Sequence, residues 1–496
     1  MSQKDQWIKY VRGCIYPQRH YPCLKGDFEV YSRYFRVPFT KQVYYGNTKI
    51  LEWYLEKKFA FRLGKTIISD LGENNQYAGE FRKNWKRNYE RAKKISSRIV
   101  WSTDLQKLSG SRLKKLYLDW FDASEHFNGI SNVSIDAVDE VLQEDIRKEL
   151  RAVVKNDALL EEAWRILTTP TEATYVQKRD LEALELAKKI KKTVKAEINW
   201  QNYREEIQSI VKKYWWSTLG WMADKKYLEP DAKKEVSRFL KDKKLEEKYW
   251  QFKNFSKITE EAKKKELKKI RATDKLKKLL QVFEEIAVFK DQRKEGQVYL
   301  VAANMKLLQE IARRKKEMAY RDLVWLTGTE IADYLEGKTG LKKIADKRKD
   351  HTIIIVTKNK IIVKEGQEAW DLRNELFPEE KIKQVKEFRG LPASRGQAKG
   401  KVLVTLSSDY ANKHIKKGDI LVTAQTTPDF VPAMRRAGAV ITDEGGATSH
   451  AAIISRELNI PCIVGARIAS DVLKTGDLVE VNATEGLVKI LKRAKK

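Results

Sequence analysis

Five residues near the C-terminal end, Gly445, Gly446, Thr448, Ser449 and His450, have types and spacing that suit phosphoryl chemistry. A glycine pair lets the backbone approach a phosphate closely, and two hydroxyls can donate hydrogen bonds to phosphoryl oxygens. The histidine offers an imidazole nitrogen as the nucleophile. Because no set of metal ligands surrounds it in the sequence, we expect no metal here. The pattern predicts a loop in which His450 takes up a phosphoryl group.

A strand and a helix must position this loop. An apolar run that ends at Ile441 predicts a buried strand leading to the glycines. Thr448 and Ser449 are good N-cap residues, and the apolar residues within 451–458 predict a helix directly after them. His450 is therefore expected in the first helical turn.

The first turn of a helix favours this chemistry. Its unpaired N–H groups and the positive end of the helix dipole attract a phosphate. The same field disfavours an imidazolium by about 0.3–1 kcal/mol, which lowers the pKa and keeps the imidazole neutral for attack.

An extended set of motifs resembles the swivelling phosphohistidine domain of phosphoenolpyruvate synthase, pyruvate phosphate dikinase and rifampin phosphotransferase. The matching motifs are Gly390-Leu-Pro-Ala-Ser-Arg-Gly396, Gly400-Lys-Val402, Gly418-Asp-Ile-Leu-Val422, Thr426-Thr-Pro428, Gly445-Gly-Ala-Thr-Ser-His-Ala-Ala452, Arg456-Glu457, Ile460-Pro461, Val464-Gly465, Gly476-Asp477 and Glu485-Gly486. They follow the family's order from residue 390 to the end of the sequence.

The resemblance implies roles for individual residues. His450 is the phosphorylated residue, and Thr448 corresponds to a regulatory phosphorylation site of the dikinases and synthases. Gly445, Gly446, Thr448 and Ser449, together with Arg456, are the residues expected to bind or support the phosphate.

Composition indicates a multidomain chain of 496 residues, with 42% hydrophobic and 34% charged residues. No apolar run approaches the length of a membrane span and no secretion signal opens the sequence, so we expect a cytoplasmic protein without a membrane partner. Cys14, Cys23 and Cys462 are too few for a disulfide framework and lack the spacing of a zinc site, so we interpret them as free thiols.

The net charge of +30, from 99 Lys and Arg against 69 Asp and Glu, raises an anionic partner as a possibility. Residues 390–496 hold 16 basic and 10 acidic residues, or +6, which leaves +24 for the remainder. Lysines there alternate with glutamates and apolar positions, as on solvated helix faces. We favour the interpretation that the excess of lysine is a compositional habit of the source genome. An anionic partner such as nucleic acid is the less favoured alternative.

The fold expected is a large all-α body with a small β-hairpin, followed by an α/β swivelling domain. Its parts are a mostly helical region at 1–100, a helical body at 101–376 with a hairpin near 351–366, a linker at 377–389 and the swivelling domain at 390–496. The boundary follows a change in composition, because all 13 tryptophans precede it while 10 of the 24 glycines follow it. The helical region also resembles, diffusely, the substrate-side region of rifampin-phosphotransferase-like proteins.

Local patterns within this body predict helix starts and core packing. Thr169-Pro-Thr-Glu172 predicts a helix start with a capping box, and Trp325-Leu-Thr-Gly-Thr-Glu330 predicts the turn and cap between two helices. Trp215, Trp216 and Trp221 are expected to pack the core, with an aromatic ligand pocket as the alternative. Gly64-Lys65-Thr66 and Gly337-Lys338-Thr339 lack the earlier glycine of a phosphate-binding loop, and His20, His126, His351 and His414 are isolated. We expect neither of these two glycine-lysine-threonine segments, and none of these four histidines, to be a ligand site.

The leading hypothesis is a phosphotransferase component that carries a phosphoryl group on His450. Neither an ATP-grasp domain nor a phosphoenolpyruvate-binding barrel is recognisable, so ATP and Mg²⁺ are expected on a separate ATP-grasp polypeptide and no cofactor on this chain alone. The acceptor is expected to be a small molecule. The alternative is a basic binding protein, for nucleic acid or another anionic partner, with a non-catalytic swivelling domain.

Overall fold

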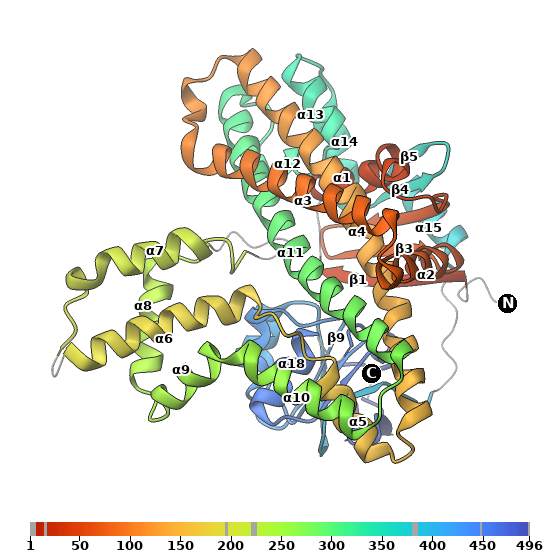
Figure 1. Ribbon diagram of the computed structural model, residues 1–496. Helices are drawn as coiled ribbons and strands as arrows, with labels where there is room; N and C mark the ends of the chain where they lie inside the picture. Colours follow the sequence, from red (N-terminus) through yellow and green to blue (C-terminus); the bar gives the residue numbers. More distant parts are fainter. Residues whose placement is uncertain are drawn as a thin grey trace. The chain divides into compact units, whose positions relative to one another are not determined.

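The computed structural model describes residues 6–13, 17–193, 197–219, 226–378, 385–446 and 449–494. The chain divides into two compact units. One consists of Pro17–Phe39 and Lys58–Ala345, and the other of Met1–Tyr16, Thr40–Lys57 and Asp346–Lys496. The first is drawn as helices and the second contains the strands (Figure 1). None of the described helices is both long and apolar enough to cross a bilayer.

Helices build the first unit, as the apolar spacing predicted. Those described up to residue 350 are α1 (Pro17–Glu29), α2 (Lys57–Glu73), α3 (Gln76–Ser97), α4 (Gly110–Val153), α5 (Asp157–Leu167), α6 (Tyr175–Thr193), α7 (Arg204–Tyr214), α8 (Glu229–Leu240), α9 (Leu245–Lys253), α10 (Phe255–Lys269), α11 (Asp274–Lys315), α12 (Tyr320–Leu323), α13 (Gly328–Leu335) and α14 (Leu341–Asp350). The two longest, α4 and α11, pack against each other and against α3.

The cap predicted at 325–330 is confirmed and takes the form of a capping box, whereas the helix start predicted at Thr169 is wrong. Thr327 caps α13, where its hydroxyl accepts from Glu330 N at 3.4 Å and Glu330 Oε2 accepts from Thr327 N at 2.7 Å. The start predicted at Thr169 is not a helix start, because the Thr169 hydroxyl instead donates to Arg165 O at the end of α5. Helix α6 begins at Tyr175, behind Thr174.

Glycines allow two helix crossings in this unit. A Cβ on Gly26 of α1 would lie 2.3 Å from Glu125 O of α4, and a Cβ on Gly64 of α2 would lie 2.2 Å from Ala137 O of α4. Such distances require glycine, because backbone atoms cannot yield as side chains do. Gly64-Lys65-Thr66 is thus part of a helix interior, which agrees with its rejection as a phosphate loop.

Trp215 and Trp216 are buried, as expected of core residues. They pack with Tyr175 and Tyr299, and Trp215 lies 5.4 Å from Tyr299 between ring centroids. Trp221 lies outside the described residues. The two described tryptophans therefore belong to an aromatic core cluster between α6, α11 and the residues that follow α7.

A five-stranded antiparallel sheet in the second unit contains the predicted hairpin. Its order is β1-β3-β2-β4-β5, with β1 (Trp7–Gly13), β2 (Lys41–Gly46), β3 (Ile50–Glu56), β4 (Thr352–Thr357) and β5 (Ile361–Glu365). The hairpin of β4 and β5 is confirmed, but it is not isolated, because β4 pairs with β2. The three strands from the first hundred residues were not predicted. In β2 and β3 nearly every residue is buried, so the alternation that signals a half-buried strand is missing.

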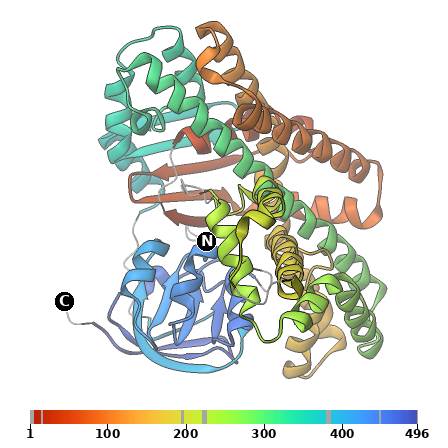
Figure 2. The same cartoon turned by 90° about the vertical axis from the view of Figure 1, so that its left-hand side faces the viewer.

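The C-terminal segment forms an eight-stranded mixed sheet of order β6-β13-β12-β8-β9-β10-β11-β7. The strands are β6 (Glu387–Arg389), β7 (Leu391–Ser394), β8 (Gln397–Val404), β9 (Ile420–Thr423), β10 (Ala439–Thr442), β11 (Cys462–Val464), β12 (Leu478–Asn482) and β13 (Leu487–Lys492). Strands β8 to β11 are parallel to one another, and the remaining pairs are antiparallel. Short helices accompany this sheet (Figure 2), namely α16 (Ser408–His414), α17 (Val431–Met434), α18 (His450–Leu458) and α19 (Ala469–Val472).

Both ends of the predicted linker 377–389 belong to folded structure. Phe377 stacks on Tyr54 of the five-stranded sheet with ring centroids 3.5 Å apart, and α15 (Gln367–Leu376) precedes it. Residues 387–389 form β6 and pair with β13. Residues 379–384 lie outside the described residues, so a linker remains a prediction for that stretch alone.

Candidate active site

His450 is the first residue of α18, so its expected place in the first helical turn is confirmed. Ser449 is the N-cap, and its hydroxyl accepts from Ala452 N at 3.4 Å. Ser449 N in turn donates to Gly446 O at 2.9 Å. Thr448 and the residue before it lie outside the described residues, so the proposed regulatory site has no structural account.

Gly445 shapes the turn between β10 and α18. Its φ is +104°, a conformation that side-chain-bearing residues rarely adopt. A Cβ there would lie 2.7 Å from Ser449 Cβ. Substitution of Gly445 would therefore strain the backbone and press on the cap of α18.

Thr426 holds the imidazole of His450. Its Oγ1 and His450 Nδ1 share a hydrogen bond of 2.9 Å, and Thr426 is only 6% exposed. The contact follows from topology, because Thr426 comes after β9 and His450 after β10, and these strands are adjacent and parallel. Segments that leave the carboxyl ends of parallel strands meet at the same edge of a sheet.

Thr426 belongs to one of the matching sequence motifs but was not among the predicted site residues. A signal was present, because a Thr-Thr-Pro segment follows an apolar strand one strand away from the histidine loop. Recognising it required the order of the strands, which the sequence does not state.

Two acidic residues fix the loop directly after β10. Asp443 is buried and its carboxylate accepts from Ser470 N at 3.2 and 3.3 Å. Burial raises the pKa of Asp443, and the hydrogen bonds from the Ser470 side chain and backbone oppose that rise. Glu444 follows, and its Oε1 accepts from Val11 N at 3.0 Å and forms an ion pair with the Arg12 guanidinium. Neither acidic residue was a predicted site residue.

Arg456, expected to support the phosphate, lies in the last turn of α18. It lies six positions after His450, which corresponds to about 9 Å along a helix axis. Its Nε donates to Ala393 O of β7 at 2.7 Å. This geometry favours a role in fastening α18 to the sheet.

The remaining candidates behave as structural residues. Cys462 is fully buried on β11, as predicted, and burial raises the pKa of its thiol to about 12. The side chains of Cys14 and His20 are not described. Across the described ranges, no group of three or more His, Cys, Asp and Glu residues is arranged to hold a metal ion.

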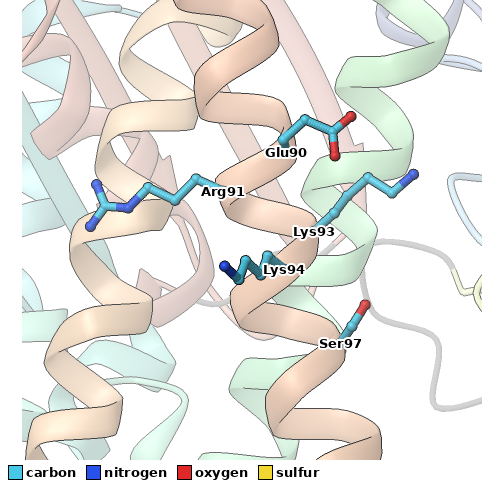
Figure 3. Close-up of a pocket in the computed structure, with 5 residues that line it drawn as sticks. All are labelled: Glu90, Arg91, Lys93, Lys94 and Ser97. Carbon is cyan, nitrogen blue, oxygen red and sulfur yellow. The ribbon is translucent and has the colours of Figure 1, made fainter.

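A separate hollow of about 500 Å³ lies along α3, lined by Glu90, Arg91, Lys93, Lys94 and Ser97 (Figure 3). Glu90, Lys93 and Ser97 point to one side of the helix, where Lys93 Nζ contacts Glu295 of α11 at 2.9 Å. Arg91 forms an ion pair with Asp122 of α4. Because two of its cations are neutralised by carboxylates and the hollow lies toward the negative C-terminal end of α3, it is a poor phosphate site.

Residues 415–486 match the family model of the PEP-utilising enzyme, mobile domain. The resemblance inferred from the motifs is therefore confirmed for that segment. The matched range contains β9, β10, the glycine loop and all of α18.

The similar curated proteins are phosphoenolpyruvate synthases. The chain is 53% identical over 113 residues to a probable phosphoenolpyruvate synthase from Pyrococcus abyssi, covering 22% of this chain and 14% of that protein. It is 48% identical over 133 residues to the phosphoenolpyruvate synthase of Pyrococcus furiosus, covering 26% and 16%. It is 54% identical over 101 residues to a probable phosphoenolpyruvate synthase from Archaeoglobus fulgidus, covering 20% and 13%. The chain thus spans only about a seventh of the length of these relatives.

Proposed function

We propose that this chain is a phosphotransferase component that carries a phosphoryl group on His450 Nε2. The observation that carries the proposal is the hydrogen bond of 2.9 Å between His450 Nδ1 and Thr426 Oγ1 at the N-terminus of α18. It orients the ring through Nδ1, and in the proposed transfer Nε2 is the nucleophile. The similarity to mobile domains and to phosphoenolpyruvate synthases supports the same chemistry.

Each group of the site has a part in the proposed transfer. With Nδ1–H donating to Thr426 Oγ1, the neutral imidazole presents the lone pair of Nε2. Attack by Nε2 forms a P–N bond while the bond from phosphorus to the donor's leaving oxygen breaks, and its electron pair leaves with that oxygen. The N–H groups of the first turn of α18 then stabilise the bound phosphoryl group. Reversal at a second site transfers the group to an acceptor.

A carrier of this kind joins two separate sites. Phosphoryl transfer depends chiefly on positioning and charge stabilisation, so a mobile histidine serves a donor and an acceptor that are too far apart for direct transfer. We place the donor site, with ATP and Mg²⁺, on a separate ATP-grasp polypeptide, and we take the acceptor to be a small molecule.

Chemical labelling tests the carrier without a partner. Phosphoramidate donates a phosphoryl group as its P–N bond breaks and ammonia leaves, so it can label a reactive imidazole directly. We expect acid-labile, base-stable label on the wild-type protein and on His414→Ala, an exposed histidine of α16 in the same sheet domain. His450→Ala should lose that label, and label that survives in this folded variant would refute the assignment.

The two-component part has a separate test. Purified chain is mixed with labelled ATP and Mg²⁺, with and without a candidate ATP-grasp polypeptide. We expect label on His450 only when that polypeptide is present. Stoichiometric labelling by ATP alone would refute the separate donor and leave the carrier intact.

A further inference from the structure

Strand β1 contacts the loop that precedes His450. Val11 N donates to Glu444 Oε1 at 3.0 Å, and the Arg12 guanidinium forms an ion pair with the same oxygen. The side chains of Arg12 and Glu444 are 22% and 17% exposed, so water is partly excluded from the pair. More than 430 residues separate the partners in sequence, and both belong to the second unit.

The position of β1 in its sheet makes this contact possible. Strand β1 is an edge strand of the five-stranded sheet and pairs only with β3 within it. Val11 of β1 lies opposite Glu52 of β3. In an antiparallel ladder every second residue turns its N–H away from the neighbouring strand, and an edge strand leaves those groups unpaired. The carboxylate of Glu444 satisfies one such N–H.

Contacts within β1 orient the Arg12 side chain toward the carboxylate. Its Nη1 also donates to Val11 O at 2.9 Å, and its guanidinium carbon lies 5.9 Å from the centre of the Tyr10 ring. A charge-assisted contact with an oriented guanidinium is stronger than a neutral hydrogen bond. The backbone N–H of Val11 and the side chain of Arg12 thus form a two-point site for one carboxylate.

Glu444 transmits this contact to the histidine loop. It is the residue before Gly445, and its backbone is fixed at both ends, since Glu444 N donates to Ala424 O at 2.9 Å and Glu444 O accepts from Thr442 Oγ1 at 2.7 Å. Gly446 O then accepts from Ser449 N, the cap of α18. The position of the Glu444 side chain is therefore coupled to the start of α18.

We propose that the outer edge of β1 is the docking site of the phosphohistidine loop, with Glu444 as the docked group and Val11 N–H and Arg12 as its receptor. The contact includes one carboxylate against one N–H and one cation, and none of these groups takes part in the pairing between strands, so it can open while both sheets stay paired. Its role as one stopping point of a moving carrier rests on the proposed function. The docking itself is independent of the chemistry of His450.

Residue-resolved hydrogen exchange at Val11 measures the docking directly. Glu444→Ala removes the acceptor, and we expect Val11 N–H to exchange at least roughly tenfold faster, while the amides of β1 that bond to β3 are unchanged. Arg12→Ala should accelerate the same amide to a smaller extent. The double variant should exchange no faster than Glu444→Ala alone, because both act on one contact.

A matched control is available in the same domain. Glu485 is exposed and, like Glu444, precedes a glycine with positive φ, Gly486 at +67°. Glu485→Ala should leave Val11 exchange as in the wild type. Val11 exchange that is unchanged in folded Glu444→Ala would overturn the proposal.

The outcome is separable from the carrier assignment. His450→Ala should keep the slow Val11 exchange, because that residue takes no part in the contact. If phosphoramidate fails to label His450 while Val11 still responds to Glu444→Ala, docking stands and the carrier role fails. If labelling succeeds and Val11 does not respond, the carrier stands without this docking site.

Discussion

Thr426 determines how His450 presents its imidazole. A histidine at the start of a helix is free to rotate about two side-chain bonds, and a hydrogen bond to Nδ1 removes most of that freedom. Thr426 is nearly fully buried behind β9, so the hydroxyl is itself held in place. It acts through His450 and is a positioning residue in the proposed transfer.

Thr426→Val should slow phosphoramidate labelling of His450 by roughly 10- to 100-fold, by analogy with the loss seen when the hydrogen-bond partner of a metal-ligating histidine is removed. Valine keeps the shape of threonine, so thermal unfolding should change little. Thr426→Ser retains the hydroxyl and should restore most of the rate, which a purely packing role would not do. Equal rates for the valine variant and the wild type would contradict the positioning role.

At the scale of elements, close helix crossings depend on where glycine stands. Gly26 of α1 faces the backbone of α4, whereas Gly79 of α3 is exposed and a Cβ there would meet nothing within 4 Å. The two glycines occupy helices of the same unit, so one substitution can be compared at both.

Gly26→Ala should destabilise the helical unit by about 3 kcal/mol, because a methyl group cannot fit against Glu125 O without separating α1 from α4. Gly79→Ala should stabilise it by about 0.5–1 kcal/mol through helix propensity. Calorimetric unfolding of both variants measures the difference. A Gly26→Ala variant as stable as Gly79→Ala would show that α1 and α4 do not approach so closely.

The buried carboxylate of Asp477 holds the end of the chain against the C-terminal sheet. It accepts from Arg493 Nη1 and Ala494 N, each at 2.8 Å, and from Lys474 N at 3.1 Å. Burial alone would raise the pKa of Asp477, but the backbone donors Ala494 and Lys474 together with Arg493 lower it overall.

Because the folded pKa is depressed, Asp477 contributes stability above the unfolded pKa of about 4 and loses it as the pH falls through the lower folded value. Asp477→Asn should therefore destabilise the domain at pH 7 by about 2 kcal/mol, and the gap from wild type should shrink below about pH 4. Urea unfolding, followed by hydrogen exchange of the backbone amides of residues 478–492, measures the stability difference at pH 7 and its change with pH. Glu480 is exposed on β12, which begins directly after Asp477, and Glu480→Gln should have little effect. A gap that persists unchanged to pH 2 would contradict the ionised role.

At the scale of the whole molecule, the net charge of +30 is the dominant feature. Many surface lysines already pair with carboxylates on the helices, as Lys189 does with Glu206 and Lys213 with Glu182. The unbalanced remainder repels itself, and self-repulsion destabilises a compact state.

Added NaCl should raise the thermal midpoint of the chain. Screening shortens the Debye length from about 20–30 Å near 0.01 M to about 3 Å at 1 M, and the exposed ion pairs that it weakens contribute little. Scanning calorimetry in a series of NaCl concentrations measures the effect, and a neutral osmolyte at equal osmolality serves as its control. A midpoint that falls with NaCl would show that the ion pairs outweigh the repulsion.

The sequence alone determined the family resemblance of the C-terminal segment and the helical nature of most of the body. Gly445 forms a turn, Ser449 caps a helix and His450 begins it. Each of these roles depends on residues nearby in the sequence, so the sequence could predict them. Apolar spacing likewise predicted long helices, because a helix face is a local property. The hairpin of β4 and β5 was readable for the same reason.

Tertiary structure decided the features that join distant residues. Thr426 reaches His450 only because β9 and β10 are adjacent, and Val11 reaches Glu444 only because β1 is an edge strand. Strands β2 and β3 escaped prediction because both are buried along nearly their whole length, which removes the alternation that the sequence would show. The order of strands depends on which apolar faces are buried against each other. Because that burial involves residues from the whole fold, no single stretch of sequence predicts the order.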